Sequence, residues 1–143
     1  MTEDLKRAVA LLGRGGTTVA LVSGDREKTD GRRGVAPLMA WIEAGEDFTG
    51  WSAADLVVGR AAALLYRKLG VSAVYGAYMS RGGQALLTSF GIEWSCSESC
   101  ERILNREHTG PCPMDAAVEG IDEPEAAVAA IRETLAALRR KNA

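Results

Sequence analysis

The architecture of this chain follows from the run Ala54-Asp55-Leu56-Val57-Val58-Gly59-Arg60-Ala61-Ala62-Ala63-Leu64-Leu65. A surface helix shows one apolar stripe, whereas a helix that is apolar on nearly every face is buried between other elements. We therefore predict that this run belongs to a central helix, with Ser52 as its N-cap and Gly70 at its end. In layered α/β proteins the first N–H groups of such a helix point at ligands, which predicts a site there.

The composition fits one globular domain over residues 1–143. Of these 143 residues, 47% are hydrophobic and 25% are charged, which is enough apolar content for a sizeable core. The formal net charge of -2 and the absence of long Lys or Arg runs argue against nucleic acid as a partner. Residues 1–7 lack the apolar core of a signal peptide, and no apolar window is long enough to span a bilayer. We expect a cytoplasmic protein without a membrane partner.

The rest of the chain alternates helix and strand patterns. The predicted helices are the segment between Thr2 and Gly13, residues 38–44, 53–69 and 84–89, a piece around 100–104, and a terminal helix from Pro124. The predicted strands are residues 17–22, 71–79 and 92–96, and the polar loop 23–34 can hide another. A strand, a buried helix and a second strand in succession indicate a parallel crossover. This order predicts a three-layer α/β/α sandwich with a mixed sheet of four or five strands.

Several short sequence motifs of the chain occur together in one protein family. They are Gly34-x-x-Pro37-Leu38, Ala54-Asp55-x-Val57-Val58-Gly59-x-Ala61-Ala62-Ala63, Ser80, Asn105-Arg106 and Cys112-Pro113-Met114-Asp115. On these blocks the chain resembles an uncharacterised prokaryotic domain-of-unknown-function family with a cytidine-deaminase-like fold. The resemblance implies a mixed sheet flanked by helices and a pocket near the start of the central helix, with no accepted activity. The chain departs from the family at Asp115, where the pattern has Glu, and at Leu56, where it tends to have Lys.

The chemistry of zinc deaminases is missing from this sequence. Those enzymes need His-x-Glu on the central helix and Pro-Cys-x-x-Cys at the start of the following helix. Here the predicted central helix begins Ala53-Ala54-Asp55 and the next helix begins Ser80-Arg81-Gly82-Gly83. The segment Pro111-Cys112-Pro113-Met114-Asp115 imitates the second motif but lies too late in the chain. We expect no zinc deaminase, and whether the protein is an enzyme stays open.

The cysteines offer a different metal site. Cys96, Cys100, His108 and Cys112 supply four N and S ligands, the inventory of a closed structural zinc site. Their spacing is not that of a standard zinc ribbon or finger, and free cysteines are commonly core residues. We favour core cysteines, and a zinc site formed by these four residues is the alternative.

Four candidate ligand-binding residues belong to the middle of the chain. Asp55 either completes a Ser-x-x-Asp capping box with Ser52 or stands at the mouth of a pocket, where it could bind a sugar hydroxyl or act as a general base. Ser80, Arg81 and Gly82 follow the carboxyl end of an interior strand, where open α/β sheets bind ligands. Backbone N–H groups and Arg81 could hold a phosphate or carboxylate there, although a helix cap explains Ser80 almost as well.

Four further candidates belong to the late segment of the chain: Asn105, Arg106, Cys112 and Asp115. An irregular Pro-rich segment with such polar residues favours a functional role. If the segment folds over the start of the central helix, Arg106 can pair with Asp55 or with a bound anion. Cys112 would then be a candidate reactive thiol.

Two functions from different classes follow. The first is a non-zinc, deaminase-fold protein that binds a small ligand, such as a nucleotide or related metabolite, at the start of the central helix. The alternative is a zinc-stabilised or oligomeric interaction module without small-molecule chemistry. A homo-oligomer is expected by analogy with deaminase-like folds, and Trp41, Trp51 and Trp94 are interpreted as core or interface anchors. No cofactor is predicted, because the chain has no Gly-x-Gly-x-x-Gly or Walker pattern.

Overall fold

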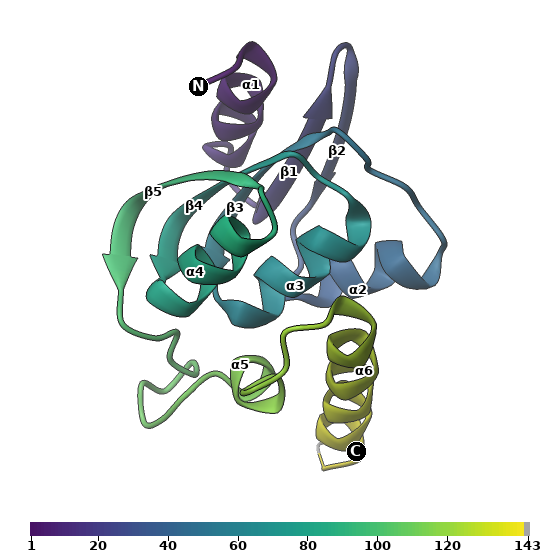
Figure 1. Ribbon diagram of the computed structural model, residues 1–143, viewed down its shortest axis with the longest axis vertical. Helices are drawn as coiled ribbons and strands as arrows, with labels where there is room; N and C mark the ends of the chain where they lie inside the picture. The colour runs from purple at the N-terminus through teal and green to yellow at the C-terminus, as the bar shows by residue number, and fades with distance from the viewer. Residues whose placement is uncertain (142–143) are drawn as a thin grey trace.

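The computed structural model describes residues 1–141 and contains a five-stranded sheet flanked by helices (Figure 1). The strands are β1 (Val19–Ser23), β2 (Arg26–Asp30), β3 (Ser52–Val58), β4 (Ala73–Ser80) and β5 (Glu93–Cys100). The helices are α1 (Glu3–Leu12), α2 (Ala36–Glu43), α3 (Arg60–Leu69), α4 (Arg81–Ser89), α5 (Pro113–Ala117) and α6 (Pro124–Lys141). Within residues 1–141, none of the helices has both the length and the apolar character needed to cross a membrane.

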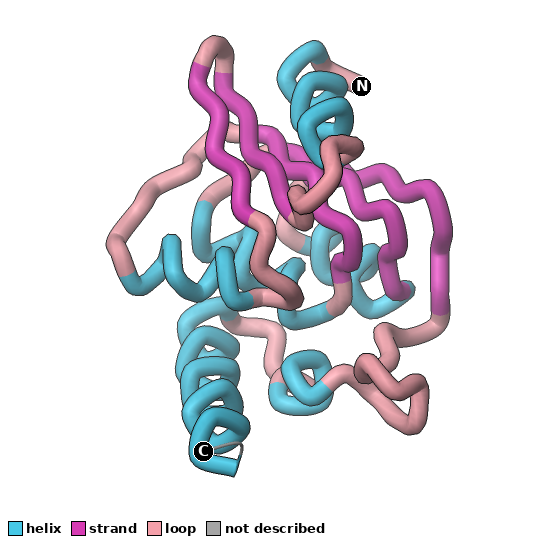
Figure 2. The backbone as a smooth tube through the Cα atoms, turned by 180° about the vertical axis from the view of Figure 1, so that it is seen from behind, coloured by secondary structure: helices cyan, strands magenta, loops and turns pink. Residues whose placement is uncertain are grey.

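The sheet is mixed, as predicted, with the strand order β2-β1-β3-β4-β5. β1 runs antiparallel to both β2 and β3, whereas β3, β4 and β5 run parallel to one another. The parallel crossover is formed by β3, α3 and β4, and not by the first strand and residues 71–79 as the sequence pattern predicts. Figure 2 shows the sheet from behind, with α1 lying across this side of it.

The predicted central helix over residues 53–69 is wrong in its first half. Residues 52–58 form β3 in the middle of the sheet, Gly59 is the N-cap, and the helix covers only Arg60–Leu69. A buried strand and a buried helix cannot be told apart by periodicity in a short apolar run, because neither has a solvent-facing side. Ser52 is therefore not a helix cap, since it pairs with Val22 of β1 and Ala73 of β4 inside the sheet.

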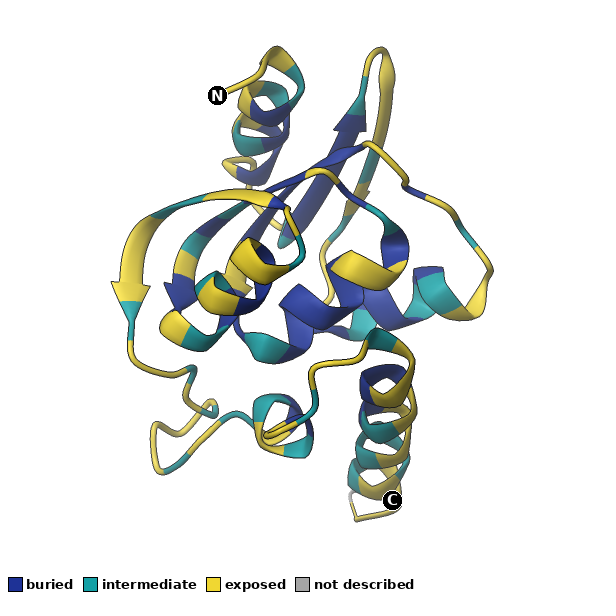
Figure 3. Ribbon diagram, in the orientation of Figure 1, coloured by how far each residue is buried: buried dark blue, intermediate teal, exposed yellow. Residues whose placement is uncertain are grey.

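The sheet separates two apolar cores. On one face α1 packs against β1 and β3 through the small residues Ala8, Ala20 and Ala54, each of which is 0% exposed. On the other face α2, α3, α4 and the start of α6 enclose a larger core (Figure 3). α3 is covered by the sheet and by four neighbouring helices, α2, α4, α5 and α6, which is why most of its residues are apolar and buried.

Other predicted elements are confirmed, with one exception. Thr2 caps α1 by accepting the N–H of Leu5 at 3.2 Å, the loop 23–34 holds β2, and α6 begins at Pro124. The helix predicted around residues 100–104 is wrong. β5 continues to Cys100 because it stays paired with β4 as far as Ser80, which keeps the backbone extended.

Candidate functional site

The carboxyl ends of β3, β4 and β5 meet at one edge of the sheet, and α3 and α4 begin there (Figure 1). We call this place the carboxyl edge. Open α/β sheets bind ligands at such an edge, because helix N-termini and strand ends bring polar groups together. Ser80, Arg81 and Gly82 lie at the carboxyl edge, as the sequence predicts.

The start of α4 is built from small residues. The buried Ser80 Oγ accepts the N–H of Gly83 at 3.1 Å, so Ser80 acts as a helix cap and is not exposed as a nucleophile. A Cβ on Gly83 would lie 3.0 Å from the carbonyl oxygen of Val58, and a Cβ on Gly82 would lie 2.9 Å from Arg60 Cγ. The two glycines therefore allow α4 to approach β3 and α3 closely.

Asp115 occupies the start of α3. Its Oδ1 accepts the backbone N–H of Ala61 at 2.9 Å, a bond that the N-cap residue Gly59 cannot make without a side chain. A Cβ on Gly59 would collide with this carboxylate and lie 2.8 Å from its Cγ. Burial raises the pKa of Asp115, while the backbone N–H groups of Ala61 and Arg60 lower it. The start of the central helix, where a pocket was expected, is thus filled by a carboxylate of the chain itself.

Arg60 ties the chain that follows Asp115 to α3. Its Nη2 donates to the carbonyl oxygens of Val118 at 3.3 Å and Ile121 at 2.6 Å, and it forms a 3.0 Å ion pair with Asp122. Sequence reasoning missed Arg60, because its partners lie far along the chain and are brought to it only by the fold.

Asp55 lies away from the carboxyl edge, in the middle of β3. The residue is only 6% exposed, and its Oδ2 accepts the hydroxyl of Tyr66 at 2.6 Å while its Oδ1 accepts the N–H of Val57 at 3.3 Å. Burial raises the pKa of Asp55 to about 7, although these hydrogen bonds act in the opposite direction. The capping box and the pocket mouth are both wrong for this residue, because its carboxylate faces the core between β3 and α3.

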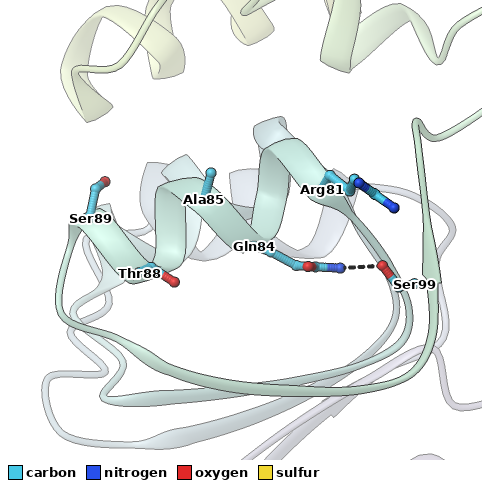
Figure 4. Close-up of a pocket in the computed structure, with 6 residues that line it drawn as sticks. All are labelled: Arg81, Gln84, Ala85, Thr88, Ser89 and Ser99. Carbon is cyan, nitrogen blue, oxygen red and sulfur yellow. Dashed lines mark hydrogen bonds between the residues drawn. The ribbon is translucent and has the colours of Figure 1, made fainter.

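An open groove runs along α4 beside β5, from the carboxyl edge at Arg81 to the end of the helix at Ser89 (Figure 4). It has a volume of about 660 Å³ and is lined by Arg81, Gln84, Ala85, Thr88, Ser89 and Ser99. Gln84 Nε2 donates to Ser99 Oγ at 2.7 Å, and Arg81 forms a 2.9 Å ion pair with Glu101. The sequence predicts only Arg81 among these residues. The spacing of residues 81, 84, 85 and 88 could have shown that they share one face of a helix.

A second hollow continues the groove along β5. It has a volume of about 440 Å³ and shares Thr88 with the groove. Its other lining residues are Gly91, Ile92, Glu93 and Trp94. Trp94 Nε1 donates to Thr88 Oγ1 at 2.8 Å, and Trp94 is 37% exposed. Trp94 therefore borders a surface hollow, whereas Trp41 and Trp51 are buried in the larger core, as predicted.

The model of the family TM1506, described as a domain of unknown function (DUF1893), matches residues 7–135. This chain belongs to the DUF1893 family. It is also similar to the crystal structure of a DUF1893 family protein (TM1506) from Thermotoga maritima, with 22% sequence identity and a TM-score of 0.81. That match covers 95% of this chain and 91% of the Thermotoga chain, and at this identity it shows the fold alone. No curated protein matches the sequence.

In this DUF1893 domain the late segment does not gather its predicted residues into one site. Asn105 shapes a hairpin turn, because its Oδ1 accepts the N–H of Thr109 at 3.0 Å. Arg106 is exposed in that turn, while Asp55 is buried beneath α3, so the expected pairing of the two is not formed. Of the four late candidates, only Asp115 bonds to the start of α3.

In this DUF1893 domain the four residues of the alternative zinc site are spread over β5, the hairpin turn and the start of α5. Cys96 and Cys100 lie half-buried on β5, Cys112 is half-buried before α5, and His108 is exposed in the hairpin turn. Within the part of the chain that the structure describes, no group of three or more His, Cys, Asp or Glu residues could hold a metal ion. Burial, followed by the neighbouring Cys96, Asp115 and Glu101, raises the pKa of the Cys100 thiol, which disfavours a reactive thiolate at this position.

Proposed function

We propose that this protein binds a small anionic ligand of the nucleotide type in the groove between α4 and β5. The observation that carries the proposal is the groove itself, with a guanidinium group at one end and amide and hydroxyl groups along its walls (Figure 4). Arginine pairs with phosphate through charge-assisted hydrogen bonds, and hydroxyl and amide groups suit the oxygens of a sugar.

This location differs from the one that the sequence suggests. The start of α3 is filled by the carboxylate of Asp115, whereas the groove beside the start of α4 is open. Arg81 is 73% exposed and its partner Glu101 is 78% exposed. An exposed ion pair of this kind contributes little, about 0–1 kcal/mol, so a bound phosphate can compete with Glu101 for the guanidinium group.

The two neighbouring hollows suit an elongated ligand. The stretch of β5 from Trp94 to Ser99, which joins the two hollows, is about 16 Å long at about 3.3 Å per residue. A nucleotide with its phosphate beside Arg81 could place a planar ring near the exposed part of Trp94. Stacking on an aromatic side chain would favour such a ring over an aliphatic group.

Arg81→Ala is expected to weaken nucleotide binding by about tenfold or more, because a hydrogen bond to a charged group contributes about 1.5–3 kcal/mol. A thermal-shift panel of nucleotides and sugar phosphates would first identify a ligand, since binding to the folded state stabilises it by mass action. Calorimetric titration of the wild type and the variant would then measure the loss of affinity.

Arg140→Ala is the matched control, because it removes the same kind of side chain from an exposed position near the end of α6. It should leave the affinity unchanged. Equal losses of nucleotide affinity in the two variants would show that only the net charge of the protein matters. The absence of any stabilising compound in the panel would contradict the proposal.

We also propose that the fold is cytidine-deaminase-like but has lost the deaminase metal site. Two observations support the deaminase-like fold: the sheet is mixed, and α3 and α4 begin at the same edge of it. Zinc deaminases carry their two motifs at such helix starts. Here those helix starts read Gly59-Arg60-Ala61 and Ser80-Arg81-Gly82-Gly83, without His or Cys. A cytoplasmic location and the lack of a nucleic-acid partner remain predictions from the sequence.

Self-association is a further part of the proposal. Leu56, Val57 and Tyr78 are 39%, 42% and 53% exposed, and Val57 and Tyr78 are direct neighbours on β3 and β4. Exposed apolar side chains that cluster in this way favour a contact with a second copy.

We expect native mass spectrometry to find a dimer or larger assembly without bound zinc. The variant Tyr78→Arg should shift this assembly toward the monomer. A monomer at every concentration, or about one zinc per chain, would contradict this expectation.

A further inference from the structure

Residues 101–123, which join β5 to α6, pack against the larger core through the side chains of Cys112, Met114, Val118 and Ile121, and most of their other side chains are exposed. Only Met114 and Val118 are buried within this segment, and its regular structure is limited to α5 and a bridge between Leu104 and Pro111. Segments with few buried apolar side chains open locally at a lower free energy than the core of a protein. In Figure 1 the segment passes below the amino ends of the helices on this face of the sheet.

Polar contacts fasten this segment to the start of α3. The carboxylate of Asp115 lies in the hollow left by Gly59 and accepts the N–H of Ala61 at 2.9 Å. Arg60 holds the chain on the other side of α5 through the carbonyl oxygens of Val118 and Ile121. The contacts are specific, because a side chain on Gly59 would exclude the carboxylate.

The same segment begins beside the groove. Its first residue, Glu101, forms the 2.9 Å ion pair with Arg81, the one guanidinium group among the groove-lining residues. Release of the segment would therefore free Arg81 from its carboxylate partner and uncover the first N–H groups of α3. Both changes favour an anion at the carboxyl edge.

We propose that residues 101–123 form a strap that closes the amino end of α3, that Asp115 is its latch, and that the strap opens as one unit when the groove takes up its anionic ligand. The ligand part rests on the proposed function, whereas the latch can be tested without any ligand. Because the ligand binds when the strap is open, a change that raises the population of the open strap should strengthen ligand binding by up to the same factor.

Amide hydrogen exchange tests the latch. Asp115→Ala removes the bond to Ala61 and should accelerate exchange of residues 112–121 and of the first amides of α3 by about tenfold, the effect of a lost helix cap. Exchange in β4 should not change, because the rest of the sheet stays closed. Glu119→Ala is the matched control, since Glu119 is exposed on the same segment. Equal exchange in the two variants, or acceleration over the whole chain, would overturn the latch.

Titration with adenosine monophosphate tests the link to the groove. The Asp115→Ala variant should bind this probe about three- to tenfold more tightly than the wild type, up to the tenfold loosening expected of the strap. Unchanged affinity, together with a loss of binding in Arg81→Ala, would overturn the link but leave the proposed function in place. Absence of binding in every variant, with fast exchange still confined to the strap, would overturn the proposed function and support the latch alone.

Discussion

Asp55→Asn is expected to raise the free energy of unfolding by up to about 4 kcal/mol at pH 8 and to change it little at pH 4. Burial raises the pKa of Asp55 from its ordinary value of 3.8 to about 7 in the folded protein. A shift of one pKa unit corresponds to about 1.4 kcal/mol, so a difference of about three units gives this magnitude.

The sign follows from the protonation of each state. Between about pH 4 and 7 the unfolded chain has lost the proton of Asp55, whereas the folded protein keeps it. The stabilising contribution of this carboxyl is therefore complete below pH 4 and is lost as the pH rises to about 7. Asparagine imitates the neutral acid at every pH, so the difference between variant and wild type should grow over this range.

Tyr66→Phe tests the same pair from the other side. The hydroxyl of Tyr66 donates to Asp55 at 2.6 Å and favours the charged carboxylate. Its loss should cost about 2 kcal/mol, and more at pH 8 than at pH 5. Urea unfolding at pH 4, 6 and 8 measures both variants, with the exposed Tyr78→Phe as the control. Parallel stability curves for wild type and Asp55→Asn would show that Asp55 titrates normally.

Gly59→Ala is expected to destabilise the protein by about 2–3 kcal/mol, because it breaks a bond to a charged, partly buried carboxylate. The new Cβ would lie 2.8 Å from Asp115 Cγ, so the carboxylate must leave the start of α3. Backbone strain does not contribute, since Gly59 has φ -108 and ψ -163, which other residues also adopt. Urea unfolding at neutral pH measures the loss.

A double-mutant cycle separates this collision from other effects of alanine. The three atoms nearest to the new Cβ all belong to the Asp115 carboxylate, so in the Asp115→Ala background Gly59→Ala should be neutral or stabilise by up to about 1 kcal/mol. Gly15→Ala is the control, because a Cβ there meets nothing within 4 Å. If Gly59→Ala costs the same in both backgrounds, the carboxylate does not fill this hollow.

Elements with strong local signals could be predicted from the sequence. The Thr2 cap and the apolar positions that follow it define α1, and Pro124 with its long helical stripe defines α6. The pattern of apolar residues predicts β4 and β5, and the family blocks indicate a domain-of-unknown-function family, which the match to DUF1893 confirms. The predicted carboxyl-edge position of Ser80, Arg81 and Gly82 is also correct, because it depends only on the end of one strand.

The candidate site was predicted only in part. The sequence indicates both Asp55 and Asp115 as candidates. It does not show that Asp55 accepts a hydrogen bond from Tyr66, or that Asp115 accepts one from the first turn of α3. The groove needs Gln84 from α4 and Ser99 from β5, two residues on different elements that are joined by a 2.7 Å hydrogen bond. No local pattern connects such residues.

The sequence by itself determined which residues are apolar, where α1 and α6 begin, where α1, α3 and α4 end, and that no zinc deaminase motif stands at either helix start. Only the tertiary structure decided that residues 52–58 are a strand between β1 and β4, and that α3 starts after Gly59. The physical reason is that burial on all sides removes the periodicity that distinguishes a helix from a strand, so pairing with neighbouring strands settles the outcome. The same pairing sends Asp55 into the core and leaves the start of α3 to a carboxylate from a distant part of the chain.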